Sequence, residues 1–176
     1  MKKETPSRKY LAEFVYGGID GVVTTFAIVA GAMGASLGAV VILILGFANL
    51  FADGFSMGIS NYLSMKSERD LNRNGKNFRS KDPKKTALAT FTFFLIVGFI
   101  PLLSFVAALP FPQIENYKFH LSFVLTGIAL LVVGAFKGKV IGKHSIKSAI
   151  ETFLIGGVAA IIAFAVGYLI RSFVVG

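Results

Sequence analysis

Five long apolar segments constrain the fold of this chain more than any other feature. They cover about residues 11–36, 38–65, 87–109, 119–136 and 149–171. A helix needs about 20 apolar residues to cross the roughly 30 Å hydrocarbon core of a bilayer. Because backbone polar groups have no water to bond within lipid, segments of this kind must be helical. The sequence therefore predicts an all-α integral membrane protein, with residues 1–176 forming a single domain of five transmembrane helices.

Composition excludes the main alternatives to a membrane protein. Hydrophobic residues make up 55% of the 176, and charged residues 15%, against about 25% charged residues in an ordinary soluble domain. The mean hydropathy of +0.72 also excludes a disordered chain. Cysteine is absent, so disulfides, thiolate ligands and a cysteine nucleophile are excluded. A bound metal would have to use oxygen, nitrogen or thioether ligands.

The distribution of basic residues predicts the orientation in the membrane. Four Lys or Arg lie in residues 2–9, eight in 66–85 and four in 137–147, whereas only Lys118 and Arg171 lie on the opposite side. Cytosolic loops retain Lys and Arg, so we expect a cytosolic N-terminus, an external C-terminus and a basic cytosolic loop over 66–85. Topology and anionic lipid headgroups then explain the net charge of +9, and no nucleic-acid partner is expected.

The first apolar segment is expected to remain in the mature protein. Glu13 and Asp20 interrupt it, and it is longer than the 7–15 apolar residues typical of a signal peptide. With no cleavable or organellar targeting segment recognised in this short sequence, a prokaryotic plasma membrane is the expected location.

Glycine and proline positions predict how the helices connect and pack. A tight turn at residues 34–38 makes the first two helices an antiparallel hairpin, and Pro101 predicts a kink in the third. Small residues spaced by four allow close helix contact in lipid. Such pairs are Gly17 with Gly21, Gly54 with Gly58, and the series Gly134, Gly138 and Gly142. Contact within one subunit and contact between two are both compatible with this spacing.

Two carboxylates occur where lipid should exclude them. Asp20 and Asp53 lie inside the first and second segments, although a charge at the bilayer centre costs at least about 2.5–3.5 kcal/mol. At a rise of about 1.5 Å per residue, Asp20 lies ~16 Å beyond Lys9 and Asp53 lies ~18 Å before Met65. Their similar depth in adjacent antiparallel helices predicts that the two groups face each other.

Other polar residues extend this pair into a track. Helical spacing places Asn49, Asp53, Ser56, Met57, Ser60 and Ser64 on one face of the second helix, with Asn61 beside them, and aligns Glu13, Asp20 and Thr24 on the first. The track contains acidic residues but neither Lys nor Arg, so a cation is its expected occupant. The Met57 thioether favours a transition metal such as Fe(II) or Mn(II) over calcium. Met57 as an apolar filler, and the Asp pair as a structural hydrogen bond or shared proton, remain alternatives.

Residues 54–58 match the G-x-S-x-G motif of serine hydrolases, which requires a strand-to-helix turn and a histidine base. This pentapeptide lies within a hydrophobic helix. His120 and His144 are the only histidines. His120 is expected at the outer end of the fourth helix and His144 in a cytosolic loop, so neither reaches Ser56. We therefore expect no enzyme.

Several segments, taken together, identify a family resemblance. Residues 16–31 and 49–64 resemble the two hallmark segments of the vacuolar iron transporter family, and the likeness continues through 98–103, 134–138 and 148–157. The resemblance implies a homodimer formed through the first two helices, with the metal path at their interface. It also implies export of Fe(II), and often Mn(II), from the cytosol in exchange for protons. Metal is then a transported substrate, and no permanently bound cofactor is expected.

The resemblance assigns roles to individual residues. Asp20 matches the family's essential first-helix Asp, Met57 its second-helix Met, and Glu13 a common acidic position. Asp53 fits the bacterial type of second motif, while Asn49 stands where some eukaryotic members carry an acidic residue. One departure is clear, because a basic connection of about twenty residues stands where the plant transporters have a Glu- and Met-rich cytosolic domain. The chain therefore resembles the short nodulin-like or bacterial branch.

The hypothesis from sequence is thus a metal transporter in which metal and protons compete for Asp20 and Asp53. Two adjacent carboxylates cannot both stay ionised in a low-dielectric site without a cation. The alternative is a non-transporting membrane scaffold, whose buried Asp residues only stabilise helix packing.

Overall fold

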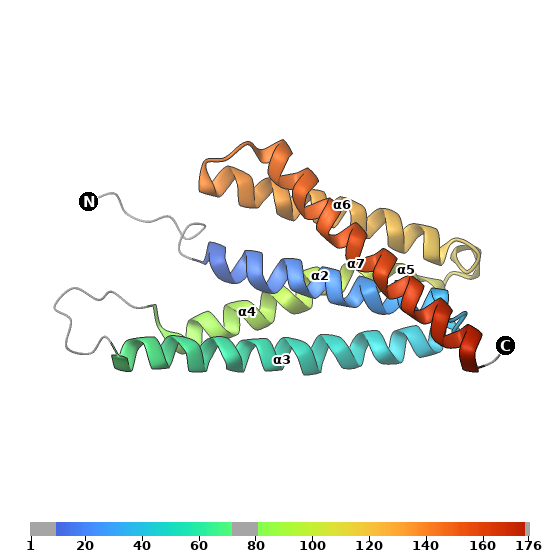
Figure 1. The fold of residues 1–176 in the computed structure, drawn as a ribbon, viewed down its shortest axis with the longest axis horizontal. Helices are drawn as coiled ribbons and strands as arrows, with labels where there is room; N and C mark the ends of the chain where they lie inside the picture. Colours follow the sequence, from blue (N-terminus) through green and yellow to red (C-terminus); the bar gives the residue numbers. More distant parts are fainter. Residues whose placement is uncertain (1–9, 72–80, 175–176) are drawn as a thin grey trace.

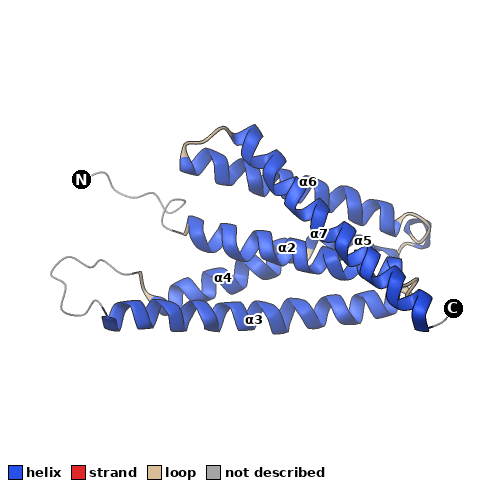
Figure 2. Cartoon of the chain, viewed as in Figure 1, coloured by secondary structure: helices blue, strands red, loops and turns tan. Residues whose placement is uncertain are grey.

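The computed structural model describes residues 10–71 and 81–174, and every regular element within them is a helix (Figure 2). The elements are α2 (Leu11–Gly34), α3 (Ala39–Leu71), α4 (Pro83–Gly98), η1 (Ile100–Leu102), α5 (Leu103–Ala108), η2 (Pro112–Ile114), α6 (Lys118–Ile141) and α7 (Ser145–Val174). Five helical stretches among them are long and apolar enough to span a membrane, with Pro83–Ala108 counted as one. The predicted all-α fold with five membrane-spanning helices is confirmed.

The spans run back and forth along one axis of the bundle (Figure 1). α2 and α7 therefore point the same way, and the first and last described residues lie at opposite ends of the molecule. An odd number of crossings requires this arrangement. It is compatible with the predicted cytosolic N-terminus and external C-terminus, which stay a prediction.

The helix boundaries correct those expected from hydropathy. α3 continues to Leu71 instead of ending at residue 65, and α4 begins at Pro83 instead of residue 87. Residues 66–71 and 83–85 are thus helical, and only part of the predicted 66–85 segment is a loop; residues 72–80 of it lie outside the described residues. The reason is that an apolar run ends where lipid ends, whereas a helix of Lys, Glu and Arg continues into water.

Local chemistry explains where α4 begins. The Asp82 carboxylate accepts a hydrogen bond from the Lys84 backbone N–H at 3.0 Å, which caps the helix, and Pro83 occupies the first helical position, where its missing N–H is harmless.

The fourth and fifth spans are also longer than expected. α6 continues to Ile141 instead of residue 136, and α7 runs from Ser145 to Val174 instead of from 149 to 171.

The turn between α2 and α3 has only four residues, 35–38. Ser36 adopts a positive φ of 55°, and the Leu37 N–H donates to the Ala32 carbonyl at 2.8 Å. The Arg171 guanidinium of α7 also donates to the Ser36 hydroxyl. The predicted antiparallel hairpin is confirmed, and α7 contacts its turn.

Helix α4 packs against both α2 and α3, and the glycines of those helices make this possible. A Cβ on Gly17 would lie 2.5 Å from the Thr90 carbonyl oxygen, and one on Gly21 would lie 2.5 Å from that of Phe94. Gly54 faces the rings of Phe91 and Phe94, and Gly58 faces the Ala87 carbonyl. All four glycines thus contact α4 of the same protomer.

The third span is interrupted at the proline that predicted a kink. Between α4 and α5 the chain forms the 3₁₀ turn η1 (Ile100–Leu102), with Pro101 at its centre. The Ser122 hydroxyl of α6 donates to the Pro101 carbonyl at 2.7 Å. This bond satisfies a buried acceptor and ties the interruption to α6.

Helices α6 and α7 form a second close pair. A Cβ on Gly134 would lie 2.7 Å from the Ser148 carbonyl oxygen, and one on Gly138 would lie 2.8 Å from the Ser148 Cβ. Gly142 has a different role, because it ends α6 in the left-handed region at φ 79° and nothing lies within 4 Å of a Cβ built there. Glycine is favoured at such a helix end because it carries no Cβ penalty.

Candidate functional site

A hydrogen-bonded contact fixes the register of α2 against α3 at the level of the predicted site. The Thr24 hydroxyl donates to the Asp20 carbonyl at 2.8 Å, and the Asn49 side-chain amide approaches the Thr24 hydroxyl at 3.4 Å. Asp20 lies one turn before Thr24, and Asp53 lies one turn after Asn49. Because the helices are antiparallel, Asp20 and Asp53 both lie one turn from this contact in the same direction along the bundle. Their carboxylates are therefore at the same level, and their negative charges repel each other.

Neither the Asp20 nor the Asp53 carboxylate is neutralised by another described residue of the chain. Both Asp20 and Asp53 are half-buried, yet in the part of the chain that the structure describes neither side chain accepts a hydrogen bond or forms an ion pair. A carboxylate of this kind inside a membrane-spanning segment is costly unless a cation or proton compensates it. The two carboxylates therefore form an uncompensated pair of negative charges between α2 and α3.

A cavity of about 840 Å³ opens between α2 and α3, toward the end of the bundle where α2 begins and α3 ends. We call it the vestibule. It is lined by Ala12, Glu13, Val15, Tyr16, Ser60, Asn61, Ser64, Met65, Glu68 and Lys81. Glu13 precedes Asp20 by seven residues, or about 10 Å along the helix. Polar groups thus follow one another from the mouth of the bundle toward the Asp pair.

Lys81 changes the charge predicted for this track. Its Nζ lies 3.0 Å from Glu13 Oε1 and 3.1 Å from Oε2, and it also stands 5.9 Å above the Tyr10 ring. The Glu13 side chain is only 4% exposed. The expectation that the track holds no Lys or Arg is therefore wrong, because Lys81, two residues before α4, brings an ammonium group to the buried Glu13 carboxylate.

The remaining predicted residues are distributed around this path. Ser60 and Asn61 line the vestibule, but the Asn61 amide also donates to the Thr90 hydroxyl of α4 at 2.5 Å. Met57 is half-buried and packs against the main hydrophobic cluster of the protomer. Ser56 is exposed on the outer face of α3. The structure thus brings Asp20, Thr24, Asn49 and Asp53 together and leaves Ser56 facing away from the protomer.

Three vestibule residues that could act on a cation, Met65, Glu68 and Lys81, were not predicted from the sequence. Met65 is the last residue of the predicted second helix, whereas Glu68 and Lys81 lie in the predicted loop. Glu68 follows Ser64 by four residues, so continuing the helical spacing of the polar face past residue 65 could have found it. No local pattern identifies Lys81, because its partner Glu13 is 68 positions away in sequence.

The described part of the chain does not contain a three-ligand metal site. Among the described residues, no three His, Asp or Glu side chains gather closely enough to hold a metal ion. The serine-hydrolase motif lacks the strand-to-helix turn that it requires, because residues 54–58 lie inside the uninterrupted helix α3. The arrangement can attract a cation at the vestibule and accept it between two carboxylates.

These features define a polytopic helical membrane protein with an acidic path between its first two helices. Residues 11–81 and 75–168 match the VIT family profile, and the chain belongs to the VIT family.

Relatives align over most of the chain. A protein named vacuolar iron transporter from Toxoplasma gondii is 29% identical and covers 94% of this chain and 76% of its own length. Vacuolar iron transporter 1 of Arabidopsis thaliana is 25% identical, with 97% and 90% covered. Vacuolar iron transporter homolog 5 of Oryza sativa is 30% identical, with 86% and 75% covered. These names denote transporters, in agreement with the expectation that the chain is not an enzyme.

The lengths of the alignments also separate a relative that has additional segments from one that aligns over a shorter length. The alignment with the T. gondii protein spans 228 positions, more than the 176 residues of this chain, so that relative contains segments that this chain lacks. The alignment with the O. sativa homolog spans only 163 positions. This difference agrees with the resemblance to the short branch of the family.

Proposed function

We propose that this chain transports divalent transition-metal cations across its membrane, with Fe(II) as the main substrate and Mn(II) as a second. The relatives are named as iron transporters. The observation that carries the proposal is the Asp20–Asp53 pair, which lies at one level of two membrane-spanning helices and has no partner among the described residues. Such a pair is expensive in lipid unless a cation is its ligand.

The vestibule collects the cation in this proposal. Glu13, Glu68 and the Met65 thioether line it, and this mixture of hard and soft donors suits Fe(II) or Mn(II) better than calcium. These side chains offer a substitute for the metal-collecting cytosolic domain that the sequence lacks. From the vestibule the ion moves about two helical turns to the Asp pair, where the Thr24 hydroxyl and Asn49 amide lie one turn further on.

Proton exchange follows from the repulsion between the two carboxylates. With no metal bound, the repulsion between the two carboxylates is relieved when one of them takes a proton. Metal binding then releases that proton, and a proton arriving from the other side releases the metal. We therefore propose export from the cytosol by proton antiport, with the predicted topology placing the vestibule on the cytosolic side.

A second copy of the chain completes the site in this proposal. The outer face of α3 exposes the Ser56 and Ser60 hydroxyls beside the half-buried Asp53 and Met57, although hydroxyl groups gain nothing from facing lipid. One protomer also lacks a three-ligand group within its described part. A homodimer packed through α2 and α3 would cover these hydroxyls and bring two Asp pairs and two thioethers to one axis.

The scaffold alternative loses its main support. A packing role for Asp20 and Asp53 requires hydrogen bonds from neighbouring helices, and none to either side chain is recorded among the described residues. The expected prokaryotic plasma membrane also gains no support, because the relatives come from eukaryotes and are named for the vacuole. The host membrane stays a prediction.

Metal uptake into acid-loaded proteoliposomes tests the proposal. We expect Fe(II) flux that competes with Mn(II) and collapses when the pH gradient is dissipated. Asp20→Asn and Asp53→Asn should each reduce flux at least tenfold while leaving the melting temperature unchanged, because Asn keeps the size of Asp but binds metal poorly. Asp70→Asn, an exposed residue near the end of α3, is the matched control. Full flux in the double variant would rule out the Asp pair as the metal site.

A further inference from the structure

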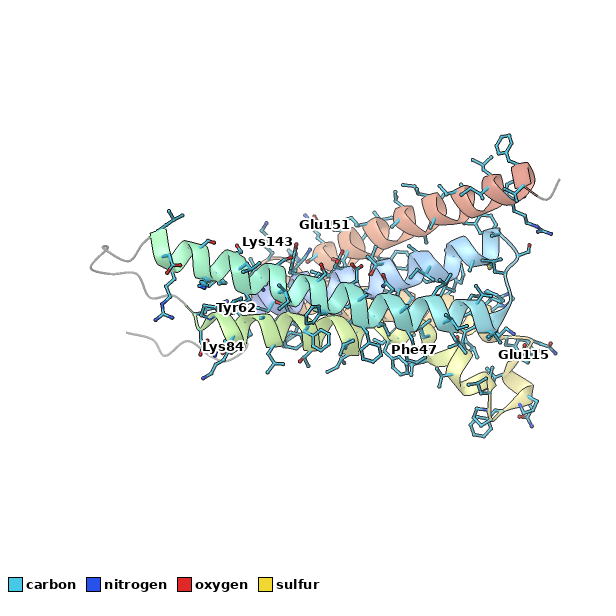
Figure 3. The ribbon with its side chains drawn as sticks, turned by 90° about the horizontal axis from the view of Figure 1, so that it is seen from below. Phe47, Tyr62, Lys84, Glu115, Lys143 and Glu151 are labelled. Atoms are coloured by element: carbon cyan, nitrogen blue, oxygen red, sulfur yellow. The ribbon has the colours of Figure 1, made fainter. Side chains whose placement is uncertain are left out.

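A second polar cavity lies between α6 and α7, remote in sequence from the Asp pair and the vestibule. It has a volume of about 470 Å³ and is lined by Lys137, Gly138, Ile141, Lys143, His144, Lys147, Ser148 and Glu151. In Figure 3 the labelled Lys143 and Lys84 lie toward the same end of the bundle, opposite Glu115. The cavity is therefore at the end that the charge distribution predicts to be cytosolic.

The cavity carries more positive than negative charge. Lys137 Nζ lies 3.8 Å from Glu151 Oε2, so the one carboxylate in the lining already has an ammonium partner. Lys143 and Lys147 are exposed and form no ion pair with any described residue. His144 adds a further polar group that can donate a hydrogen bond. The excess of cationic groups around one concave space favours an anionic ligand.

Backbone structure adds one further feature that suits an anion. α6 ends at Gly142, and α7, a helix of 30 residues, begins at Ser145. The positive end of the α7 dipole therefore lies beside the cavity, next to Lys147.

The surroundings of the cavity indicate that the ligand carries acyl chains. Ile141 lines the cavity and is 53% exposed, while Ile146 and Ile150 on the first turns of α7 are 70% and 50% exposed. These apolar side chains, beside the basic groups of the cavity, suit a ligand that carries both a charged headgroup and acyl chains. Basic pockets between transmembrane helices on the cytosolic side are suited to anionic headgroups.

We propose that the α6–α7 cavity binds the phosphate-bearing headgroup of one anionic phospholipid per protomer. Lys143, Lys147 and the N-terminus of α7 hold the phosphate, and the exposed isoleucines contact the acyl chains. This lipid site is separate from the metal path and does not depend on the proposed transport function.

Native mass spectrometry of the full chain, extracted from vesicles of phosphatidylcholine mixed with phosphatidylglycerol, tests the site. We expect one phosphatidylglycerol to be retained per protomer. The double variant Lys143→Gln, Lys147→Gln should lose roughly 30-fold in phosphatidylglycerol affinity, as expected for two basic contacts to an anionic headgroup. Both residues are exposed, so the variant should keep its melting temperature.

Lys84→Gln, Lys85→Gln is the matched control, because it removes the same charge from exposed residues at the same end of the bundle but outside this cavity. It should retain the lipid. An equal loss in the control would show general surface attraction and overturn the proposal. Displacement of the lipid by inorganic phosphate alone would assign the cavity to a free anion and overturn the lipid assignment. A wild-type chain that retains phosphatidylcholine equally well would also overturn it.

Discussion

Lys81 contacts both carboxylate oxygens of Glu13, at 3.0 and 3.1 Å, and so places a tethered cation at the mouth of the path toward Asp20 and Asp53. In the proposed transport, a metal ion entering the vestibule would compete with this ammonium group for the Glu13 carboxylate. The contact joins the residues just before α4 to α2. It also links the proposed metal entry to a residue that the polar track did not predict.

Removing this competitor should strengthen metal binding. We expect Lys81→Gln to lower the apparent KM for Fe(II) or Mn(II) about fivefold, since one unit of like charge a few ångströms away in a partly hydrated site is worth roughly 1 kcal/mol. Initial rates of uptake into proteoliposomes over a range of metal concentrations measure this. Lys84→Gln removes the same charge from an exposed residue and should leave KM unchanged. An unchanged KM in Lys81→Gln would mean that Glu13 does not bind incoming metal.

Two glycine substitutions should have opposite effects on the stability of the protein. In Gly21→Ala the new Cβ would lie 2.5 Å from the Phe94 carbonyl oxygen, whereas nothing lies within 4 Å of a Cβ on Gly157. We expect Gly21→Ala to destabilise the protein by about 1–3 kcal/mol through overpacking against α4. Gly157→Ala should be neutral or stabilise by up to about 1 kcal/mol through the higher helix propensity of Ala. Thermal unfolding in detergent compares them, and equal melting temperatures would contradict the close α2–α4 contact.

Two buried hydroxyls one turn apart on α6 provide another contrast. Ser122 donates to the Pro101 carbonyl at 2.7 Å, while the Thr126 hydroxyl has no partner among the described residues. Ser122→Ala should therefore cost about 0.5–1.5 kcal/mol, and Thr126→Val should be neutral or stabilising because it removes an unsatisfied polar group without changing shape. The melting temperatures of the two variants check this order, and a larger loss in Thr126→Val would indicate an unrecognised partner.

The absence of cysteine makes the proposed dimer directly testable. Ser56→Cys places a single thiol on the exposed face of α3, and Ile161→Cys places one on α7, where the native side chain is 70% exposed. Under mild oxidation in proteoliposomes, we expect Ser56→Cys to form a covalent dimer and Ile161→Cys to remain monomeric. The reverse pattern on a denaturing gel would move the dimer contact from α3 to α7.

Sequence predicted the number of spans well because the length of an apolar run is fixed by bilayer thickness. It predicted their ends poorly, since hydropathy reports the limits of lipid and not the limits of a helix. α3 thus continues through residues 66–71, and α7 begins at Ser145. The interruption at Pro101 was predictable because a missing N–H acts locally.

For the candidate site, the sequence predicted the positions of residues that depend only on the short turn between the first two helices. Asp20 and Asp53 share a level because four residues connect two antiparallel helices, and depth can then be counted from each end. The sequence did not predict contacts between distant parts of the chain. The pairing of Lys81 with Glu13 and the packing of Gly17 and Gly54 against α4 depend on how the third span crosses the first two, which periodicity does not report.

The four-residue turn between α2 and α3 also restricts how the protein can move. Residues 34 and 39 cannot separate far, and Arg171 of α7 holds Ser36 between them. These two helices can therefore spread only at the vestibule end, like a hinge closed at its far side. In the proposed transport, an ion bound at Asp53 would therefore leave between α3 and a surface other than α2.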